Sequence, residues 1–214
     1  MILLSALVAA AALAAPPAGP VAIRIGSASG TVWVASGGKR TAAKEGMKLG
    51  AGDVVETGRP GSAEIIFDNG TLIGLEPGSS FKVGALEGES ADLELSLGTL
   101  LAKVKALAGN ERWRVRARTT VVAVRGTELG VSVDSGSIVH AAVFNEGKAE
   151  VSSGTGEPVV LDYDHETSAR EGFAPLPPQP IDYFRFASKR MAELRKRQKY
   201  FMDLWLKKYG RKKP

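Results

Sequence analysis

Along most of the chain, apolar and polar residues alternate in short runs. Ala63, Ile65 and Phe67 alternate with Glu64 and Asp68, which is the period of a strand with one buried face. Similar alternation, or a short apolar run bounded by turn residues, occurs at 21–25, 30–35, 46–55, 72–75, 92–97, 112–118, 138–144, 148–151 and 159–161. These patterns predict a series of short β-strands.

The turn sequences between these runs indicate the fold class. Asp68-Asn69-Gly70 predicts a hairpin turn, because Asn-Gly readily takes positive φ at both central positions. Other turns are expected at 134–136, 145–147 and 154–157, with no helix-period segment between them. We therefore predict an all-β domain over residues 21–170, a compact β-sandwich or β-roll of many short strands.

The run 119–133, TTVVAVRGTELGVSV, has polar residues in the middle of a strand-forming sequence. We interpret it as two strands, with Gly126 permitting a bulge or corner between them. Arg125 and Glu128 are then candidates for an ion pair or backbone hydrogen bonds that hold the turn. A buried arginine without such a partner would be costly.

The chain changes character after residue 170. Residues 171–180 contain four prolines and predict a stiff, extended linker. From 181 to 209, apolar residues recur at helical spacing with Arg and Lys between them: Phe184, Met191, Leu194, Phe201, Leu204 and Trp205. We predict a basic amphipathic helix and tail over 181–214.

The first residues predict export. The unbroken apolar and small-residue run 2–15 is too short to span a bilayer, which needs about 20 residues. It fits the apolar region of a secretory signal peptide with cleavage after Ala14. We expect a signal peptide over 1–14, a spacer over 15–20 and a mature protein in the periplasm.

Charge and composition narrow the chemistry. Residues 181–214 hold twelve Lys/Arg and three Asp/Glu, whereas the rest of the chain holds sixteen and twenty, so the net charge of +5 comes from the tail. The chain has no cysteine, which excludes disulfides, thiol nucleophiles and cysteine-bound metals. Two histidines leave little material for a histidine-rich metal site. We predict no metal and no cofactor.

One acidic cluster, Asp162, Asp164, His165 and Glu166, has oxygen ligands at alternate positions that could bind calcium. Its spacing is not that of an EF-hand loop and no glycine lies at its centre. We favour a solvated acidic loop.

Enzymatic motifs are missing. Ser62 or Ser137 with His140 and Asp134 could supply the groups of a catalytic triad, but no G-x-S-x-G elbow is present. A P-loop and a dinucleotide fingerprint are also absent. We predict a protein that is not an enzyme.

Two basic features are candidate contacts for an anion or a partner. Alternate residues of one predicted strand would form a stripe about 20 Å long on one face: Arg112, Arg114, Arg116 and Arg118. That stripe could bind an anionic partner, or it could pair across strands with Asp92 and Glu94, which is the interpretation we favour.

The second feature is the C-terminal helix, whose candidate contacts are Arg190, Arg195, Lys196, Arg197 and Lys199. An anionic membrane surface, a partner helix or an envelope protein could receive it. Nucleic acid fits the charge alone, and the export leader argues against it. The alternative is a helix that packs on its own β domain with a solvated basic face.

The sequence from 115 to 133, VRARTTVVAVRGTELGVSV, resembles the signature of the FecR domain. Trp113 lies in the aromatic position of that signature and Val124-Arg125-Gly126-Thr127 match directly, whereas Ala117-Arg118 replaces the usual Thr-Pro. The segments 49–58, 62–71 and 147–151 also resemble the family, so the likeness covers about 45–165. The matching positions that we regard as structural are Asp53, Phe67, Asp68, Gly70, Val124, Arg125, Gly126 and Thr127.

This resemblance implies an exported, β-rich domain that is not an enzyme. Full sensors of the family place it in the periplasm, where it touches an outer-membrane receptor, and connect it through a membrane helix to a cytoplasmic domain that controls a sigma factor. Here the FecR-like part follows the leader almost directly, so we expect a stand-alone member that does not control a sigma factor by itself.

Three hypotheses follow. The first is an exported interaction or regulatory module of the FecR type that binds an envelope protein and is tethered by its basic helix. The second is an envelope structural or polyanion-binding protein. The third is a hydrolase with an unrecognised site.

Overall fold

The structure, a computed structural model, describes residues 21–88, 90–106, 111–154 and 156–209. Within these ranges, side chains are described up to Leu204, except that of Arg125. The predicted signal peptide (1–14) and spacer (15–20) lie outside the described residues.

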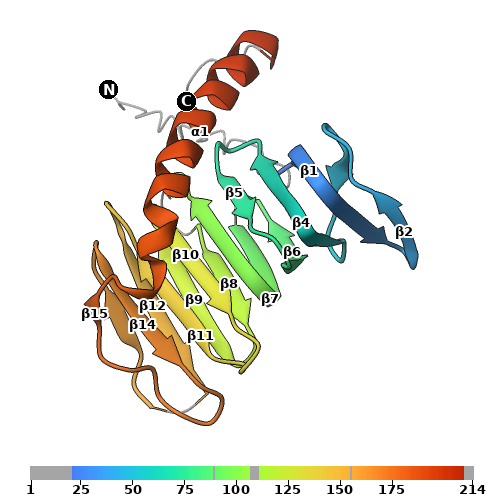
Figure 1. Cartoon of the computed structure of the whole chain (residues 1–214). Helices are drawn as coiled ribbons and strands as arrows, with labels where there is room; N and C mark the ends of the chain where they lie inside the picture. The colour runs from blue at the N-terminus through green and yellow to red at the C-terminus, as the bar shows by residue number, and fades with distance from the viewer. Residues whose placement is uncertain (1–20, 89, 107–110, 155, 210–214) are drawn as a thin grey trace, which may run out of the picture.

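Strands make up most of the described chain, and a helix follows them (Figure 1). The all-β prediction with a C-terminal helix is confirmed. The strands are β1 (Ile23–Ser36), β2 (Lys39–Ala42), β3 (Lys48–Leu49), β4 (Val54–Phe67), β5 (Leu72–Leu75), β6 (Ser80–Glu87), β7 (Ser90–Lys103), β8 (Trp113–Ala117), β9 (Thr120–Arg125), β10 (Glu128–Val133), β11 (Val139–Val143), β12 (Lys148–Ser153), β13 (Val159–Leu161), β14 (His165–Ala169) and β15 (Gln179–Pro180).

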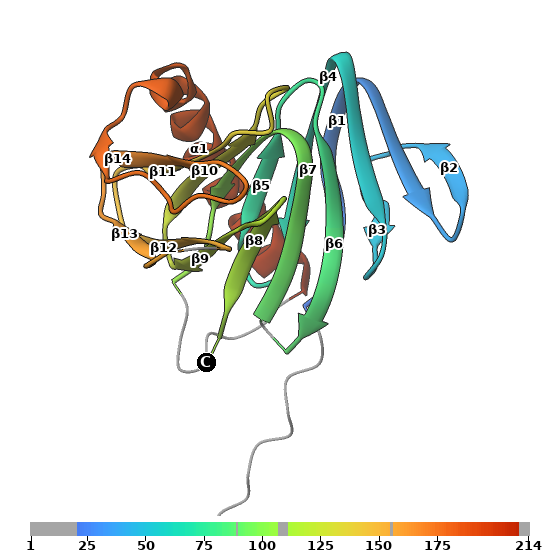
Figure 2. The same cartoon turned by 90° about the horizontal axis from the view of Figure 1, so that it is seen from below.

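The long strands β4 and β7 belong to two layers, because their halves pair with different neighbours. The first half of β4 pairs with β6 and its second half with β5. β7 pairs with β6 and β8 through its first half and with β5 and β10 through its second half. One sheet is therefore folded over itself into two layers (Figure 2). The first layer continues through β10, β11, β14 and β15, and the second through β8, β9, β12 and β13.

Gly98 lies where β7 passes from one layer to the other. Its φ is +85°, and a Cβ there would lie 2.5 Å from the Cα of Ser79. Only glycine combines that backbone conformation with so close an approach. The bend at Gly98 therefore allows one strand to contribute to both layers.

The main apolar core lies between the two layers. Phe67 and Trp113 meet there edge to face, with ring centroids 4.7 Å apart, a favoured geometry for aromatic pairs. The alternating apolar residues of the sequence fill this core, as at Val115 and Ala117 in β8.

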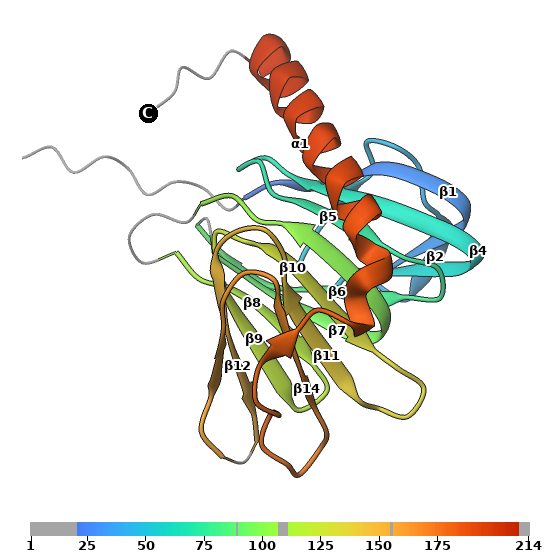
Figure 3. The ribbon, with the colours of Figure 1, turned by 60° about the vertical axis from the view of Figure 1, so that its left-hand side comes forward.

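A smaller apolar cluster lies on the outer face of the first layer. There the 3₁₀ helix η1 (Tyr183–Phe186) and the helix α1 (Ala187–Tyr209) cover the sheet, and α1 crosses the strands obliquely (Figure 3). The residues of this cluster are Leu72, Leu101, Ala142, Phe144, Phe184, Ala187, Met191 and Leu194. Strands β5 and β10 are buried on both faces because one face meets the main core and the other meets the helix.

Several predicted elements differ from the structure. The predicted strands 21–25 and 30–35 form one strand, β1, which stays paired with β4 across register shifts at 25–27 and 30–32. Such bulges interrupt the alternation of apolar residues without ending the pairing. Patterning also does not identify β6 or β14.

The predicted turn at Asp68-Asn69-Gly70 joins β4 to β5, but only Gly70 has positive φ, at +95°. The Asn69 side chain instead accepts a hydrogen bond from the Thr71 amide at 3.0 Å. The backbone amide of Phe67 also donates to the Thr71 carbonyl at 2.9 Å, so the connection is a four-residue loop rather than a two-residue turn.

The proline-containing segment 171–180 lies along β14. The Leu176 amide donates to the Ser168 carbonyl, the Thr167 hydroxyl donates to the Leu176 carbonyl, and β15 pairs with His165 and Glu166. This segment leads the chain to the start of η1.

Candidate interaction site

The run 119–133 forms two strands, as predicted. β9 ends at Arg125, β10 begins at Glu128, and Gly126 between them has φ of +55°. A Cβ on Gly126 would lie 2.7 Å from the Cα of Ala106. Both the positive φ and the close approach of Ala106 therefore require glycine at position 126. The proposed role of the Arg125 side chain falls outside the described side chains.

The polar positions of β10 face the helical segment. Glu128 pairs with Arg195 of α1, and the Ser132 hydroxyl lies 3.2 Å from the hydroxyl of Tyr183. Between them, a Cβ on Gly130 would lie 2.9 Å from the ring of Phe184. The unusual polarity of this strand is thus explained by the helix that covers its outer face.

A second glycine makes room for the helix on β5. A Cβ on Gly74 would lie 3.2 Å from a terminal carbon of Leu194. Because Gly74 and Gly130 have no side chains, Leu194 and Phe184 of the helical segment pack directly against the sheet backbone at these two positions.

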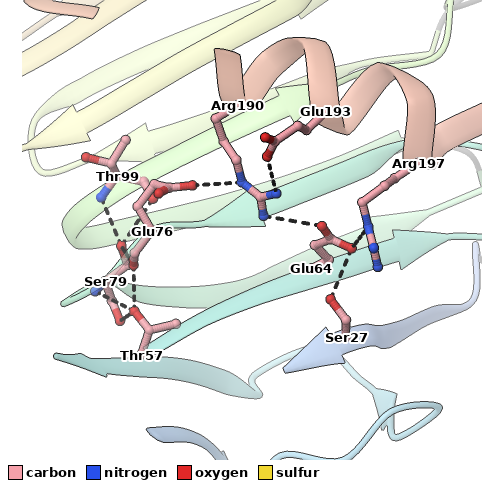
Figure 4. A network of polar contacts seen from close by, with 9 residues as sticks. All are labelled: Ser27, Thr57, Glu64, Glu76, Ser79, Thr99, Arg190, Glu193 and Arg197. Atoms are coloured by element: carbon pink, nitrogen blue, oxygen red, sulfur yellow. Dashed lines mark hydrogen bonds and ion pairs between the residues drawn. The ribbon is translucent and has the colours of Figure 1, made fainter. Parts of the chain in front are cut away.

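Buried carboxylates bind the arginines of α1 (Figure 4). Glu64 on β4 is 3% exposed. Its two oxygens lie 3.2 Å from Nη2 of Arg190 and 2.5 Å from Nε of Arg197, and it also accepts a hydrogen bond from Ser27 at 3.0 Å. Glu76, in the loop after β5, lies 3.3 Å from Nε of Arg190. Residues more than a hundred positions apart are joined in this way.

The surroundings of Arg190 alter its titration. Burial lowers the pKa of its guanidinium, but the neighbouring carboxylates of Glu64 and Glu76 raise it, and the net shift is upward. Arg190 therefore stays charged, as its pairing with a buried carboxylate requires.

Glu128 forms a second binding point on the same face. Its side chain is 1% exposed, with Nε of Arg195 at 3.3 Å and Nζ of Lys103 at 3.6 Å. The side-chain amide of Asn145 donates to its other oxygen at 2.7 Å. A carboxylate this deeply buried needs such partners, because an unpaired buried charge would be strongly unfavourable.

Glu166 forms a third binding point, at the start of the helical segment. It is 3% exposed and accepts hydrogen bonds from the backbone amides of Tyr183 and Phe184 at 3.0 and 3.2 Å, and from Gln179 at 3.2 Å. The interpretation of 162–166 as a solvated acidic loop is therefore wrong for Glu166. Its carboxylate accepts hydrogen bonds from backbone amides at the beginning of η1, which have no acceptor within the helix itself.

These contacts separate the five basic residues predicted as candidate contacts of the helix into two groups. Arg190, Arg195 and Arg197 bind carboxylates of the chain's own sheet, whereas Lys196 and Lys199 are exposed. The interpretation in which the helix packs on its own β domain describes the first part of α1. Sequence reasoning named Glu128 only as a group that holds the turn and Glu166 only as part of an acidic loop. It did not single out Glu64, since a polar residue that alternates with apolar ones normally faces solvent.

The arginine stripe lies on the exposed side of β8. The register places Asp92 opposite Arg114 and Glu94 opposite Arg116. Arg114 and Asp92 form a two-pronged ion pair at 2.6 and 2.8 Å. Arg118, beyond the strand with φ of +53°, lies 3.7 Å from Glu171. The Arg112 amide donates to Ser90.

His140 belongs to a cluster at the η1 end of the helical segment. Its ring stacks on Tyr183 with centroids 3.7 Å apart, and its Nε2 lies 3.7 Å from Asp134. Burial lowers the pKa of His140, and nearby Asp134 and Glu166 only partly oppose this shift. Ser62 lies on β4, which does not pair with β11, the strand of His140.

The family-like positions hold turns and core contacts. Asp53 accepts the Gly50 amide at 2.8 Å and Asp68 accepts the Ala22 amide at 3.1 Å. The Thr127 hydroxyl donates to the Glu146 carbonyl at 2.5 Å. Phe67 and Val124 are buried in the main core. At Gly70, a Cβ would meet the Met202 sulfur at 2.7 Å.

The described residues contain no group of three or more His, Asp or Glu side chains that could hold a metal ion. Within the same part of the chain, no helix has the length and apolarity needed to cross a membrane.

These features define a class: a two-layer β domain whose outer face is covered by a basic C-terminal helix. Comparison with known families adds the family. Residues 53–153 match the family described as "FecR protein". The prediction from the 115–133 signature is confirmed. No curated protein matches the chain.

Two solved structures have a similar fold. Both are of a "putative anti-sigma factor" from Parabacteroides distasonis ATCC 8503, at 1.65 and 2.50 Å resolution. Each is 16% identical to this chain, with TM-scores of 0.55 and 0.54. The similarity covers 64% and 63% of this chain, and 64% and 62% of the respective neighbours, so just under two thirds of their length is matched. At this identity, the likeness concerns the fold.

Proposed function

We propose that the chain is a non-enzymatic interaction and regulatory module of the cell envelope. The observation that carries this proposal is the FecR match over 53–153. It is supported by the anti-sigma-factor name of the structural neighbours, since a protein of that kind acts by contacting another protein. The buried carboxylates Glu64 and Glu128 also bind arginines of a helix of the same chain.

The proposed location is the periplasm. It is supported by the apolar run 2–15, which has the length and the A-x-A end of a signal peptide. The absence of cysteine is compatible with an oxidising compartment, because no thiol is present to form a wrong disulfide.

The polyanion-binding alternative has less support. It relied on the four arginines of 112–118 and on the basic tail. Within the stripe, Arg114 is paired with Asp92 and Arg116 lies in register with Glu94. The charge of the stripe is thus partly compensated by the neighbouring strand.

A cysteine-free chain allows a direct test for a protein partner. Single cysteines at exposed positions on different elements, Leu97, Val160, Tyr163 and Phe173, would each carry a photo-crosslinker. After illumination in intact envelopes, the module should give a discrete protein adduct from some of these positions and not from others. Crosslinking to polymer alone, or no discrete protein adduct from any position, would contradict the proposal.

A further inference from the structure

The Asn69-Gly70 pair, in the loop between β4 and β5, contacts residues of α1 that lie beyond the three sheet-bound arginines. An asparagine followed by glycine is chemically labile, because glycine has no side chain to obstruct attack of its own amide nitrogen on the asparagine side chain. That attack converts the asparagine to aspartate or isoaspartate. The surroundings of the pair decide whether the reaction can proceed in the folded chain.

The side chain of Asn69 is arranged for this reaction. The Thr71 amide donates to its Oδ1 at 3.0 Å, and such a donor stabilises the negative charge that develops on this oxygen when Cγ is attacked. The Nδ2 atom, which must leave, is buried and has no hydrogen-bond partner among the described residues. Buried amide nitrogens normally have an acceptor. The carbonyl group is therefore activated and the leaving group is not held.

The attacking group, the amide of Gly70, is restrained instead. It donates to the Phe67 carbonyl at 2.9 Å, and this bond must break before the nitrogen can turn toward Asn69. The Gln198 side chain donates to the Gly70 carbonyl at 2.7 Å. Met202 packs so closely that a Cβ on Gly70 would lie 2.7 Å from its sulfur. Two residues of α1 thus hold Gly70 in place, and local opening of the helix would free it.

Water, the second reactant, has access to the pair. A hollow of about 350 Å³ lies beside the loop, and Asn69 and Gly70 line it together with Gln198 and Met202. The charged residues Lys103, Lys105 and Glu146 also line this hollow, which favours its hydration.

From these contacts we propose that Asn69 is a deamidation site that α1 keeps closed, and that its modification releases the helix at Gln198 and Met202 irreversibly. The Gly70 nitrogen forms a bond to Cγ of Asn69, the bond from Cγ to Nδ2 breaks, and ammonia leaves with the proton of the Gly70 amide. Water then opens the cyclic imide to aspartate or isoaspartate. The chemistry is independent of the partner and the location proposed above.

Either product prevents the loop from closing again beneath the helix. Isoaspartate adds a carbon atom to the main chain, which shifts Gly70 relative to Gln198 and Met202. Aspartate places a charge where the structure buries a neutral amide nitrogen, which is unfavourable without a partner. The first part of α1 stays on the sheet, because its arginines remain bound to the buried carboxylates.

Incubation of the full chain at mildly alkaline pH, followed by peptide mapping with mass spectrometry, tests the proposal. Deamidation of Asn69 should be about tenfold slower in the chain than in a synthetic peptide of residues 64–75, because the chain must first open locally. Gln198→Ala with Met202→Ala should raise the rate in the chain about fivefold.

Two controls accompany this measurement. Lys196→Ala with Lys199→Ala changes exposed positions of the same helix and should leave the rate at that of the parent. Asn145 in the same digest is an internal reference that should stay unmodified. Its Nδ2 donates to Glu128 at 2.7 Å, and the residue that follows it has a side chain.

A second measurement needs no variant, so it stands even where a variant fails to fold. The aged chain is separated into deamidated and unmodified molecules, and hydrogen exchange is compared between them. Backbone amides of 198–204 should exchange about fivefold faster in the deamidated molecules, whereas those of 188–194 should not differ. Equal deamidation in chain and peptide, a Gln198 and Met202 variant no faster than its control, or unchanged exchange at 198–204 would each overturn the proposal.

Discussion

Two sets of arginines in this chain look alike in sequence and differ in structure. On β8, Arg114 binds Asp92 at 2.6 and 2.8 Å, and both side chains are nearly half exposed, at 46% and 44%. On α1, Arg190 binds Glu64 at a longer 3.2 Å, but the Glu64 side chain is only 4% exposed. The Arg114–Asp92 pair therefore has the shorter distances, whereas the Arg190–Glu64 pair has the more deeply buried carboxylate.

This difference shows that distance alone does not rank ion pairs. An exposed pair gains little, since water and salt screen it and two long side chains lose freedom. A pair with one buried member is different, because removal of the cation leaves a carboxylate that cannot recover its hydration. The helix arginines should therefore affect stability and the β8 arginines should not.

The largest effect is expected from Arg190→Ala with Arg197→Ala. Both changes remove cations from Glu64, so the free energy of unfolding should fall by about 3 kcal/mol. Urea denaturation followed by circular dichroism would measure it. Adding Glu64→Gln to the same variant should recover part of the loss, because the uncompensated charge is then gone. A triple variant no more stable than the double one would contradict this explanation.

Gly126 carries no charge, so a substitution there measures the cost of backbone strain separately from that of ion pairing. Gly126→Val places a branched side chain at φ of +55°, with its Cβ 2.7 Å from Ala106, and should cost about 2 kcal/mol. The loss should be the same at low and high salt. Gly154→Val is the control, since no atom lies within 4 Å of the added Cβ. A thermal melt of Gly126→Val identical to that of the parent would contradict the corner at Gly126.

The pair of His140 and Asp134 is intermediate in exposure between the two arginine pairs. The pKa of His140 is lowered by burial, so the unfolded chain binds the proton more readily than the folded one. The contribution of His140 is therefore fully present above its ordinary pKa of about 6.5, and it is lost as the pH falls through and below that value. Urea denaturation at pH 7.5 and 5.5 should show a smaller pH-dependent loss in His140→Phe than in the parent. Equal losses would contradict the shift.

The smallest effect is expected at the exposed pair. Arg114→Ala should change the free energy of unfolding by about 0.5 kcal/mol or less. Urea denaturation in parallel with the helix variants would check it. A loss as large as that of the double helix variant would mean that the exposed pair carries stability that its burial does not explain.

Much of the fold was predictable from local pattern. The alternation at 63–67 gives the inner face of β4, and the helical spacing of Met191 and Leu194 gives the face of α1 that packs on the sheet. The corner at Gly126 followed from a glycine among strand residues. These features depend on neighbours in sequence, so a single chain reveals them.

The candidate site was less predictable, because it depends on contacts between distant segments. Glu64 and Arg190 lie 126 residues apart. Nothing near Glu64 indicates that a helix covers it, since an alternating glutamate on a strand is the normal sign of a solvated face. Glu166 was misassigned because its partners, the amides of Tyr183 and Phe184, lie in a later segment of the chain. Likewise, the bulges in β1 preserve its pairing with β4, which local alternation cannot show.

Two double-mutant cycles measured side by side test the central claim most directly. One removes Glu64 and Arg190 singly and together, and the other removes Asp92 and Arg114 in the same way, with unfolding free energies from urea denaturation. We predict a coupling energy of about 1.5 kcal/mol for Glu64 with Arg190 and about 0.5 kcal/mol or less for Asp92 with Arg114. Equal couplings, or a larger one for the exposed pair, would contradict the claim that buried carboxylates hold the helix on the sheet.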